Sequence, residues 1–124
     1  MDSYKVFEKI TSNFQTIFMI YLKEHFVKGG VEFTQCFKDS ELVIFQLSQP
    51  SIDDPSEITK WYEVFQLKVK QKDIYHPDEF EKYPNDEAFG VWAWCCSNEK
   101  CVVKVLKKHF PKHSIPKWLL ELHN

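Results

Sequence analysis

The chain has 124 residues, a formal net charge of −2, and a composition that is 44% hydrophobic and 16% aromatic. This composition excludes a disordered chain, and the small net charge excludes a general electrostatic attraction to nucleic acid or anionic lipid. All sixteen basic residues are lysines, so the chain lacks the bidentate arginine contacts that recognise phosphate and guanine. The length suits one domain with its own core, and we expect a single globular domain over residues 1–124.

The N-terminal sequence has no export signal. The stretch MDSYKVFEKITSNF has no apolar signal core behind a basic segment, and the apolar run TIFMIYL is too short to cross a bilayer. Three of the four cysteines are clustered and the fourth is distant, which is unlike a secreted disulfide framework. These features predict a cytoplasmic protein with no membrane contact.

The first predicted element is a long amphipathic helix over roughly residues 3–28, because its apolar residues follow helical spacing. They are Phe7, Ile10, Phe14, Ile17, Phe18, Tyr21 and His25. The glycine pair at residues 29–30 would end this helix. A capping-box pattern at residues 12–15 leaves open a break into two shorter helices.

Four strands are predicted after the glycine pair. Residues 31–37 and 41–49 flank the turn KDS and are expected to form a hairpin. A polar loop with two prolines follows, and then residues 60–71 alternate apolar and polar side chains as a third strand. The fourth strand is predicted at residues 90–96, GVWAWCC.

Two helices are predicted at the end of the chain. Ser97 would cap a helix over residues 98–109, which Pro111 would stop, and residues 114–124 would hold a short final helix. No crossover helix separates the four strands, so a parallel sheet is excluded. The predicted fold is α+β in two layers: a long N-terminal helix, a four-stranded, mainly antiparallel sheet, a C-terminal helix and a short final helix.

A cluster of cysteines and histidines resembles a metal site at first sight. Cys96, Cys101, His109 and His113 follow the spacing C-x4-C-x7-H-x3-H. A zinc finger has about twelve residues between its pairs, and Cys101 and His109 would lie about 12 Å apart along one predicted helix. The sequence therefore predicts structural cysteines, no metal and no cofactor.

The thiol best placed for covalent chemistry is Cys96, because it directly precedes a predicted helix N-terminus. The sequence offers it no identifiable base or oxyanion site, and it contains no phosphate-binding or hydrolase motif. A small cysteine-dependent enzyme is therefore only the third hypothesis. We expect a protein that is not an enzyme and assign no catalytic residue.

An acidic segment rich in aromatic residues covers residues 72–88, and its net charge is −4. Aromatic side chains in such a segment either pin it to the core or anchor a partner protein. The candidate partner-binding residues are Tyr75, Asp78, Glu79, Phe80, Glu81, Tyr83, Asp86 and Glu87. The absence of a regular pattern over this length points weakly to function.

A lysine-rich face follows on the last long predicted helix. Lys100, Lys104, Lys107 and Lys108 would lie on its outer side, and Lys112 follows the helix. Such a face can follow a phosphate backbone, or it is only the solvated side of an amphipathic helix. A nucleic-acid-binding accessory protein is thus the second functional hypothesis.

The stretch EKYPNDEAFGVWAWCC carries a resemblance over roughly residues 61–110. Its matching positions are Glu81, Tyr83, Pro84, Asp86, Glu87, Phe89, Gly90, Ala93 and Trp94. The pattern resembles small proteins of phages and mobile elements with a YPxDExFGxxAW-type motif. This resemblance implies a counter-defence protein of the anti-CRISPR kind, acting in the cytoplasm of a bacterial host.

The first functional hypothesis follows from that resemblance. It is a non-enzymatic binding protein that inhibits a bacterial defence effector, such as an RNA-guided nuclease or another ribonucleoprotein. Contact with nucleic acid is left open. A homodimer is also left open, because Met19, Ile20 and an exposed strand edge could each support one.

Overall fold

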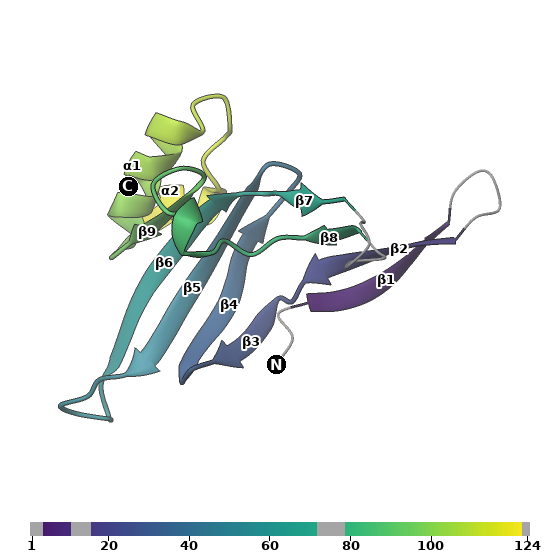
Figure 1. The fold of residues 1–124 in the computed structure, drawn as a ribbon. Helices are drawn as coiled ribbons and strands as arrows, with labels where there is room; N and C mark the ends of the chain where they lie inside the picture. Colours follow the sequence, from purple (N-terminus) through teal and green to yellow (C-terminus); the bar gives the residue numbers. More distant parts are fainter. Residues whose placement is uncertain (1–3, 11–15, 72–78, 123–124) are drawn as a thin grey trace.

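The computed structural model describes residues 4–10, 16–71 and 79–122 (Figure 1). The strands in chain order are β1 (Tyr4–Ile10), β2 (Thr16–Leu22), β3 (His25–Lys28), β4 (Val31–Lys38), β5 (Leu42–Pro50), β6 (Ile58–Gln66), β7 (Val69–Lys70), β8 (Glu79–Glu81) and β9 (Ala93–Cys96). The helices are the 3₁₀ helix η1 (Asp86–Ala88) and the α-helices α1 (Glu99–His109) and α2 (Lys117–Leu122).

The main sheet is antiparallel and has the strand order β3-β4-β5-β6-β9. Its first hairpin turns at Gly29 and Gly30, whose φ angles of 58° and 77° suit the two-residue turns that match strand twist. The central strand β5 pairs with β6 along its whole length, from Leu42 to Pro50. Residues 42–45 of β5 have no exposed surface, so the core runs through the middle of this sheet.

Strand alternation divides the core into two clusters, one on each face of the main sheet. On one face, Ile44, Val64 and Cys96 pack against Leu106 of α1 and Leu119 of α2. Figure 1 shows both α-helices on this side of the sheet. The Tyr62 hydroxyl donates a hydrogen bond of 2.6 Å to Glu99, which ties β6 to the first turn of α1.

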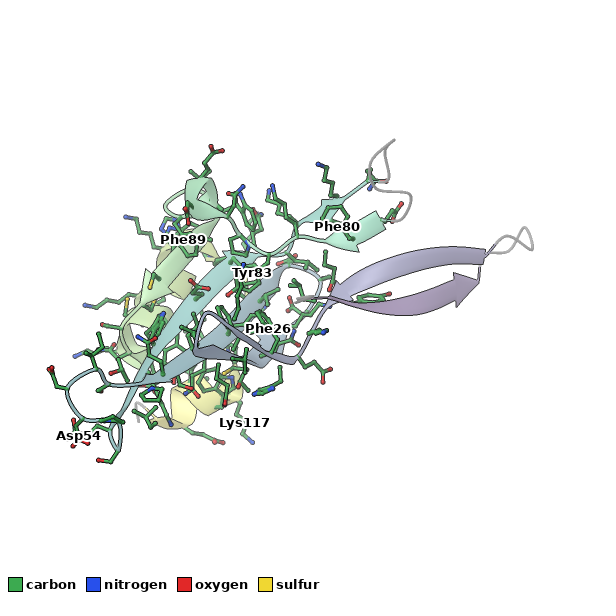
Figure 2. The ribbon with its side chains drawn as sticks, turned by 60° about the horizontal axis from the view of Figure 1, so that its bottom comes forward. Phe26, Asp54, Phe80, Tyr83, Phe89 and Lys117 are labelled. Atoms are coloured by element: carbon green, nitrogen blue, oxygen red, sulfur yellow. The ribbon has the colours of Figure 1, made fainter. Side chains whose placement is uncertain are left out.

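Aromatic side chains cover the opposite face, and Tyr83 lies at their centre. Its ring meets Phe26, Phe33, Phe45 and Phe65 edge-on, at centroid distances of 5.2–6.0 Å. These four phenylalanines come from β3, β4, β5 and β6 in turn. Figure 2 shows Tyr83 over the middle of the sheet, with Phe26 beside it. Tyr83 therefore fixes the segment that follows β8 onto the main sheet.

A second, four-stranded sheet has the order β1-β2-β8-β7. Strands β1 and β2 form an antiparallel hairpin that extends away from the main sheet (Figure 1). Strand β8 pairs in parallel with β2 through Met19–Glu79 and Ile20–Phe80, and antiparallel with β7. The second sheet thus joins the N-terminal hairpin to the acidic segment.

The predicted long N-terminal helix is wrong, since most of that region forms β1 and β2. The apolar spacing fitted a helix, but residues 16–22, TIFMIYL, form an unbroken apolar run, for which periodicity does not separate helix from strand. Its β-branched and aromatic residues favour a strand. Pairing with the distant β8 then stabilises that strand, and local spacing gives no sign of this pairing. The alternative helix break, at residues 12–15, lies outside the described residues.

Other parts of the fold prediction hold only in outline. The main sheet has five strands instead of four, because β3 was assigned to the helix. Predicted strands 31–37 and 41–49 are confirmed as β4 and β5, while predicted strand 60–71 is split into β6 and β7. The predicted two-layer arrangement is incomplete, because the segment that contains Tyr83 and Phe89 packs on the face of the main sheet opposite the α-helices. Helix α1 is confirmed, but Asn98 caps it instead of Ser97, by accepting a 2.9 Å hydrogen bond from the backbone N–H of Cys101.

An ion pair inside the structure connects the two sheets. The Glu81 residue on β8 is 4% exposed, and its Oε1 atom lies 2.5 Å from Nζ of Lys38 on β4. The same oxygen accepts a 3.0 Å hydrogen bond from the backbone N–H of Leu22 on β2. The Lys38 ammonium also lies 4.9 Å from the ring centroid of Tyr21. A buried carboxylate needs such partners, since loss of one leaves an uncompensated charge.

We expect the substitution Lys38→Met to lower the free energy of unfolding by about 3 kcal/mol, because it leaves the Glu81 carboxylate buried and unpaired. Urea denaturation would measure this loss. The matched control is Lys28→Met, which removes an exposed lysine at the end of β3. The double variant Lys38→Met/Glu81→Leu should recover much of the stability. Equal losses in Lys38→Met and Lys28→Met would contradict a stabilising role for the ion pair.

Candidate functional site

A groove with a cavity volume of about 410 Å³ lies at one end of the main sheet. Three segments that are far apart in the sequence meet there: the β4–β5 turn, the end of β6, and the end of α1 with the loop after it. The lining residues are Ser40, Glu41, Gln66, Leu67, His109, Phe110, Pro111, Lys112 and His113. Apolar and polar side chains are thus mixed, as in ligand-binding clefts.

His113 holds two sides of this groove together. Its Nε2 atom lies 2.5 Å from Oδ2 of Asp39 in the β4–β5 turn, and its Nδ1 atom lies 2.5 Å from the backbone oxygen of Ser114. Both ring nitrogens face acceptors, so the protonated imidazolium, which donates from both nitrogens, fits this position best. The ring also packs edge-on against Phe37, at a centroid distance of 5.8 Å.

Charge near this contact shifts the pKa values of both partners. Burial acts to lower the pKa of His113, but the hydrogen bonds to Asp39 and Ser114 and the charges of Asp39 and Glu41 raise it above its ordinary value. Burial acts to raise the pKa of Asp39, but the backbone N–H donors of Glu41 and Leu42, together with His113, lower it overall. Both shifts favour the ionised pair near neutral pH.

His109 forms another wall of the groove and is backed by Trp94. The two rings are stacked, with centroids 4.1 Å apart and an angle of 18° between their planes. Trp94 lies on β9 and also meets Phe110 edge-on. The imidazole of His109 is exposed on its other side, so it is held in place while it remains accessible to a ligand.

A lysine–tryptophan cluster adjoins the groove and consists of Lys68, Lys82 and Trp92. Both ammonium nitrogens lie 6.0 Å from the ring centroid of Trp92. The backbone N–H of Lys82 donates a 2.8 Å hydrogen bond to the carbonyl of Lys68, which places the two lysines side by side. The carbonyl of Trp92 accepts a 2.9 Å hydrogen bond from Gln66, a residue that lines the groove. The cluster therefore lies next to a residue of the groove lining.

The predicted partner-binding set is spread over different environments. Tyr75 and Asp78 lie outside the described residues. Glu79 and Phe80 are half-buried in β8, and Glu81 is buried against Lys38. Tyr83 is half-buried and packs against the core, so of the two roles left open for the aromatic residues it has the pinning role. Only Asp86 and Glu87 of the described members are exposed.

A half-buried carboxylate explains the orientation of the Tyr83 hydroxyl, which donates a hydrogen bond to Oε1 of Glu63. Burial raises the pKa of Glu63, and burial together with the Glu63 charge raises the pKa of Tyr83. The Cys95 residue pairs with Glu63 across β6 and β9, and burial and that carboxylate raise the pKa of its thiol. This environment disfavours a reactive thiolate at Cys95.

The predicted lysine face forms only in part. Lys100, Lys104, Lys107 and Lys108 are exposed on α1, as expected for the outer side of an amphipathic helix. Lys112 instead lines the groove. The structure therefore places Lys112 beside Gln66, His109 and His113 in the groove lining, which contains none of the α1 lysines.

The cysteines and histidines of the motif also lie apart. Cys96 is fully buried, while burial and the neighbouring thiols of Cys101 and Cys95 raise its pKa, so its thiol is poorly placed for the attack considered in the third hypothesis. His109 and His113 face the groove. Among the residues that the structure describes, no group of three or more metal-ligating side chains is arranged to hold an ion.

Comparisons with known proteins give no assignment: no protein-family model, curated protein or solved structure matches this chain. Within the described part of the chain, no helix has the length and apolar character needed to cross a membrane.

Sequence reasoning missed the groove and the lysine–tryptophan cluster. Their residues come from at least three distant segments, and each segment alone has an ordinary composition. Lys68 precedes the acidic segment and Lys82 lies within it, and their positions in the sequence give no sign of a shared site. Nothing in the sequence places these lysines beside Trp92.

We expect the contact between His113 and Asp39 to make stability depend on pH. The pKa of His113 is raised above 6.5 in the folded protein, so its contribution is complete below 6.5 and is lost as the pH rises through the folded value. The pKa of Asp39 is lowered below 3.8, so its contribution is lost only as the pH falls through that lowered value. Thermal unfolding should be measured from below the lowered pKa of Asp39 to above the raised pKa of His113. Between these two pKa values, His113→Gln should lower the free energy of unfolding by roughly 1 kcal/mol.

The control for this prediction is His25→Gln. His25 forms an exposed ion pair with Glu32 at 3.5 Å, so its loss should change the pH profile little. If His113→Gln keeps the wild-type pH profile between the lowered pKa of Asp39 and the raised pKa of His113, the contact does not stabilise the fold.

Proposed function

We propose that the chain is a non-enzymatic binding protein that holds its partner at the groove end of the main sheet. The observation that carries this proposal is the groove itself, which the polar residues His109, Lys112 and Gln66 line together with the apolar residues Leu67 and Phe110. A concave surface with a few converging polar groups is the ordinary form of a binding site. The buried thiol of Cys96 supports binding over cysteine catalysis.

The class of partner comes from the resemblance of residues 61–110 to small phage and mobile-element proteins. That resemblance implies inhibition of a bacterial defence effector, and we propose a nucleoprotein effector in the bacterial cytoplasm as the partner. The exposed lysines at this end of the molecule support a partner that carries phosphate. The acidic segment is a weaker candidate for the partner contact than the groove, because Glu81 pairs with Lys38 and Tyr83 packs against the core.

Affinity capture with the tagged chain from a bacterial lysate tests this proposal. We expect wild-type protein to retain an effector that mass spectrometry identifies. Two groove variants should reduce the amount of retained effector at least roughly tenfold. They are Lys112→Glu, which reverses a charge, and Ser40→Trp, which fills the groove. The matched control is Lys117→Glu on α2, where the side chain is 90% exposed and outside the groove.

The comparison between these variants decides the outcome. Loss in both groove variants with retention in Lys117→Glu supports binding at the groove. Capture that is equal in all four proteins contradicts it. Circular dichroism of each variant would establish that a loss of capture does not come from unfolding.

A further inference from the structure

The lysine–tryptophan cluster has the composition of a surface that binds unpaired nucleotides. Trp92 is half-buried and its ring meets Phe65 edge-on, at a centroid distance of 6.3 Å and an interplanar angle of 76°. The core thus fixes the indole in position. Lys68 and Lys82 then bring two positive charges to the same ring.

These two lysines differ from Lys38, whose ammonium also lies over an aromatic ring. The Lys38 ammonium is neutralised by Glu81 at 2.5 Å, whereas Lys68 and Lys82 form no ion pair with any carboxylate of the described residues. Their side chains are long and flexible, so an ammonium group can move from the indole to a phosphate at small cost. A ligand would therefore meet two available charges beside a fixed aromatic ring.

The basic surface continues from this cluster into the groove. Residues 66–68 connect the two, because Gln66 and Leu67 line the groove and Lys68 directly follows them. Lys112 supplies a third ammonium group there, while Glu41 is the only acidic residue of the lining and Asp39 is held by His113. The exposed carboxylates Asp86 and Glu87 of η1 precede Trp92 in the chain, so phosphate would be held by direct contacts with the three lysines and not by a general excess of positive charge.

We propose that this surface binds single-stranded nucleic acid, with Lys68, Lys82 and Lys112 on successive phosphates and an unpaired base against Trp92. Stacking on an aromatic ring requires an exposed base face, which a single strand offers and a duplex does not. The inference rests on the proposed function in that it names the chemistry of the partner at the same end of the molecule.

The lysine face of α1 is a weaker site for phosphate. Part of this face lies at the C-terminal end of the helix, where Lys107, Lys108 and His109 occupy the last turn, whereas Lys100 lies in the first turn. The carbonyl groups at that end carry the negative side of the helix dipole, which the lysines offset and which repels phosphate. Within the described residues, the four lysines exposed on α1 also contact no aromatic ring, unlike Lys68 and Lys82.

The test uses the purified full chain and a fluorescently labelled oligothymidylate in anisotropy titrations at several salt concentrations. Three phosphate contacts predict a slope of log affinity against log salt of roughly −2 for a single strand. Lys68→Glu/Lys82→Glu should weaken binding at least roughly tenfold and make the slope shallower. Trp92→Phe should weaken it several-fold while leaving the slope unchanged, because stacking releases no counterions.

The matched control is Lys104→Glu/Lys108→Glu, which makes the same charge change on α1 and should retain wild-type affinity. The proposal is overturned if the wild-type chain does not bind the oligonucleotide at low salt, or if the α1 variant loses binding while Lys68→Glu/Lys82→Glu retains it. Preference for a duplex of the same length would also overturn it. Effector capture that depends on Lys112 and Ser40 without any oligonucleotide binding would leave the proposed function standing and reject this inference alone.

Discussion

The packing of Tyr83 against four phenylalanine rings is the contact on which the rest of the molecule depends. It joins β3, β4, β5 and β6 to a segment that follows them in the sequence. Once Tyr83 is fixed, Lys82 on one side of it faces the end of the main sheet, and Glu81 reaches the buried position beside Lys38. The packing of Tyr83 therefore holds against the main sheet the segment that carries both residues.

Polar contacts fix the orientation in which the segment around Tyr83 packs on the main sheet. An aromatic ring in a hydrophobic cluster can occupy several orientations at similar free energy, but a buried carboxylate can be satisfied in very few. The Tyr83 hydroxyl bonds to Glu63, and Glu81 bonds to Lys38 and to the backbone of Leu22. These two carboxylates define which part of the segment faces the sheet, so the neighbouring lysines are left at the surface.

Elements whose signals are local could be predicted from the sequence. The hairpin at residues 31–50 follows from alternation around a polar turn, and α1 follows from its apolar spacing and from Pro111 after its end, although its cap is Asn98 and not the predicted Ser97. The N-terminal strands could not be predicted in this way, because an apolar run with accidental helical spacing becomes β2 only when it pairs with β8. Local patterns carry no information about such a distant partner.

The candidate site was predictable to a smaller extent for the same reason. The sequence showed that the aromatic residues of the acidic segment were either pins or anchors, and only the packing of Tyr83 decides between these roles. The groove combines residues near positions 40, 66 and 112, and no spacing rule relates them. Lys112 was recognised as a candidate, but its predicted neighbours were the helix lysines instead of His109 and Gln66.

The parallel pairing of β2 with β8 also constrains the order of assembly. The hydrogen bond from Leu22 to Glu81 spans 59 positions of the chain, whereas the hairpins of the main sheet close over short turns. The entropy lost on closing a loop grows with its length, so contacts between near neighbours form at lower cost than this one. During synthesis, β2 of the N-terminal hairpin can pair with β8 only after residues 79–81 have left the ribosome. The edge of β2 that β8 later covers is therefore unpaired for most of the time that the chain is being made.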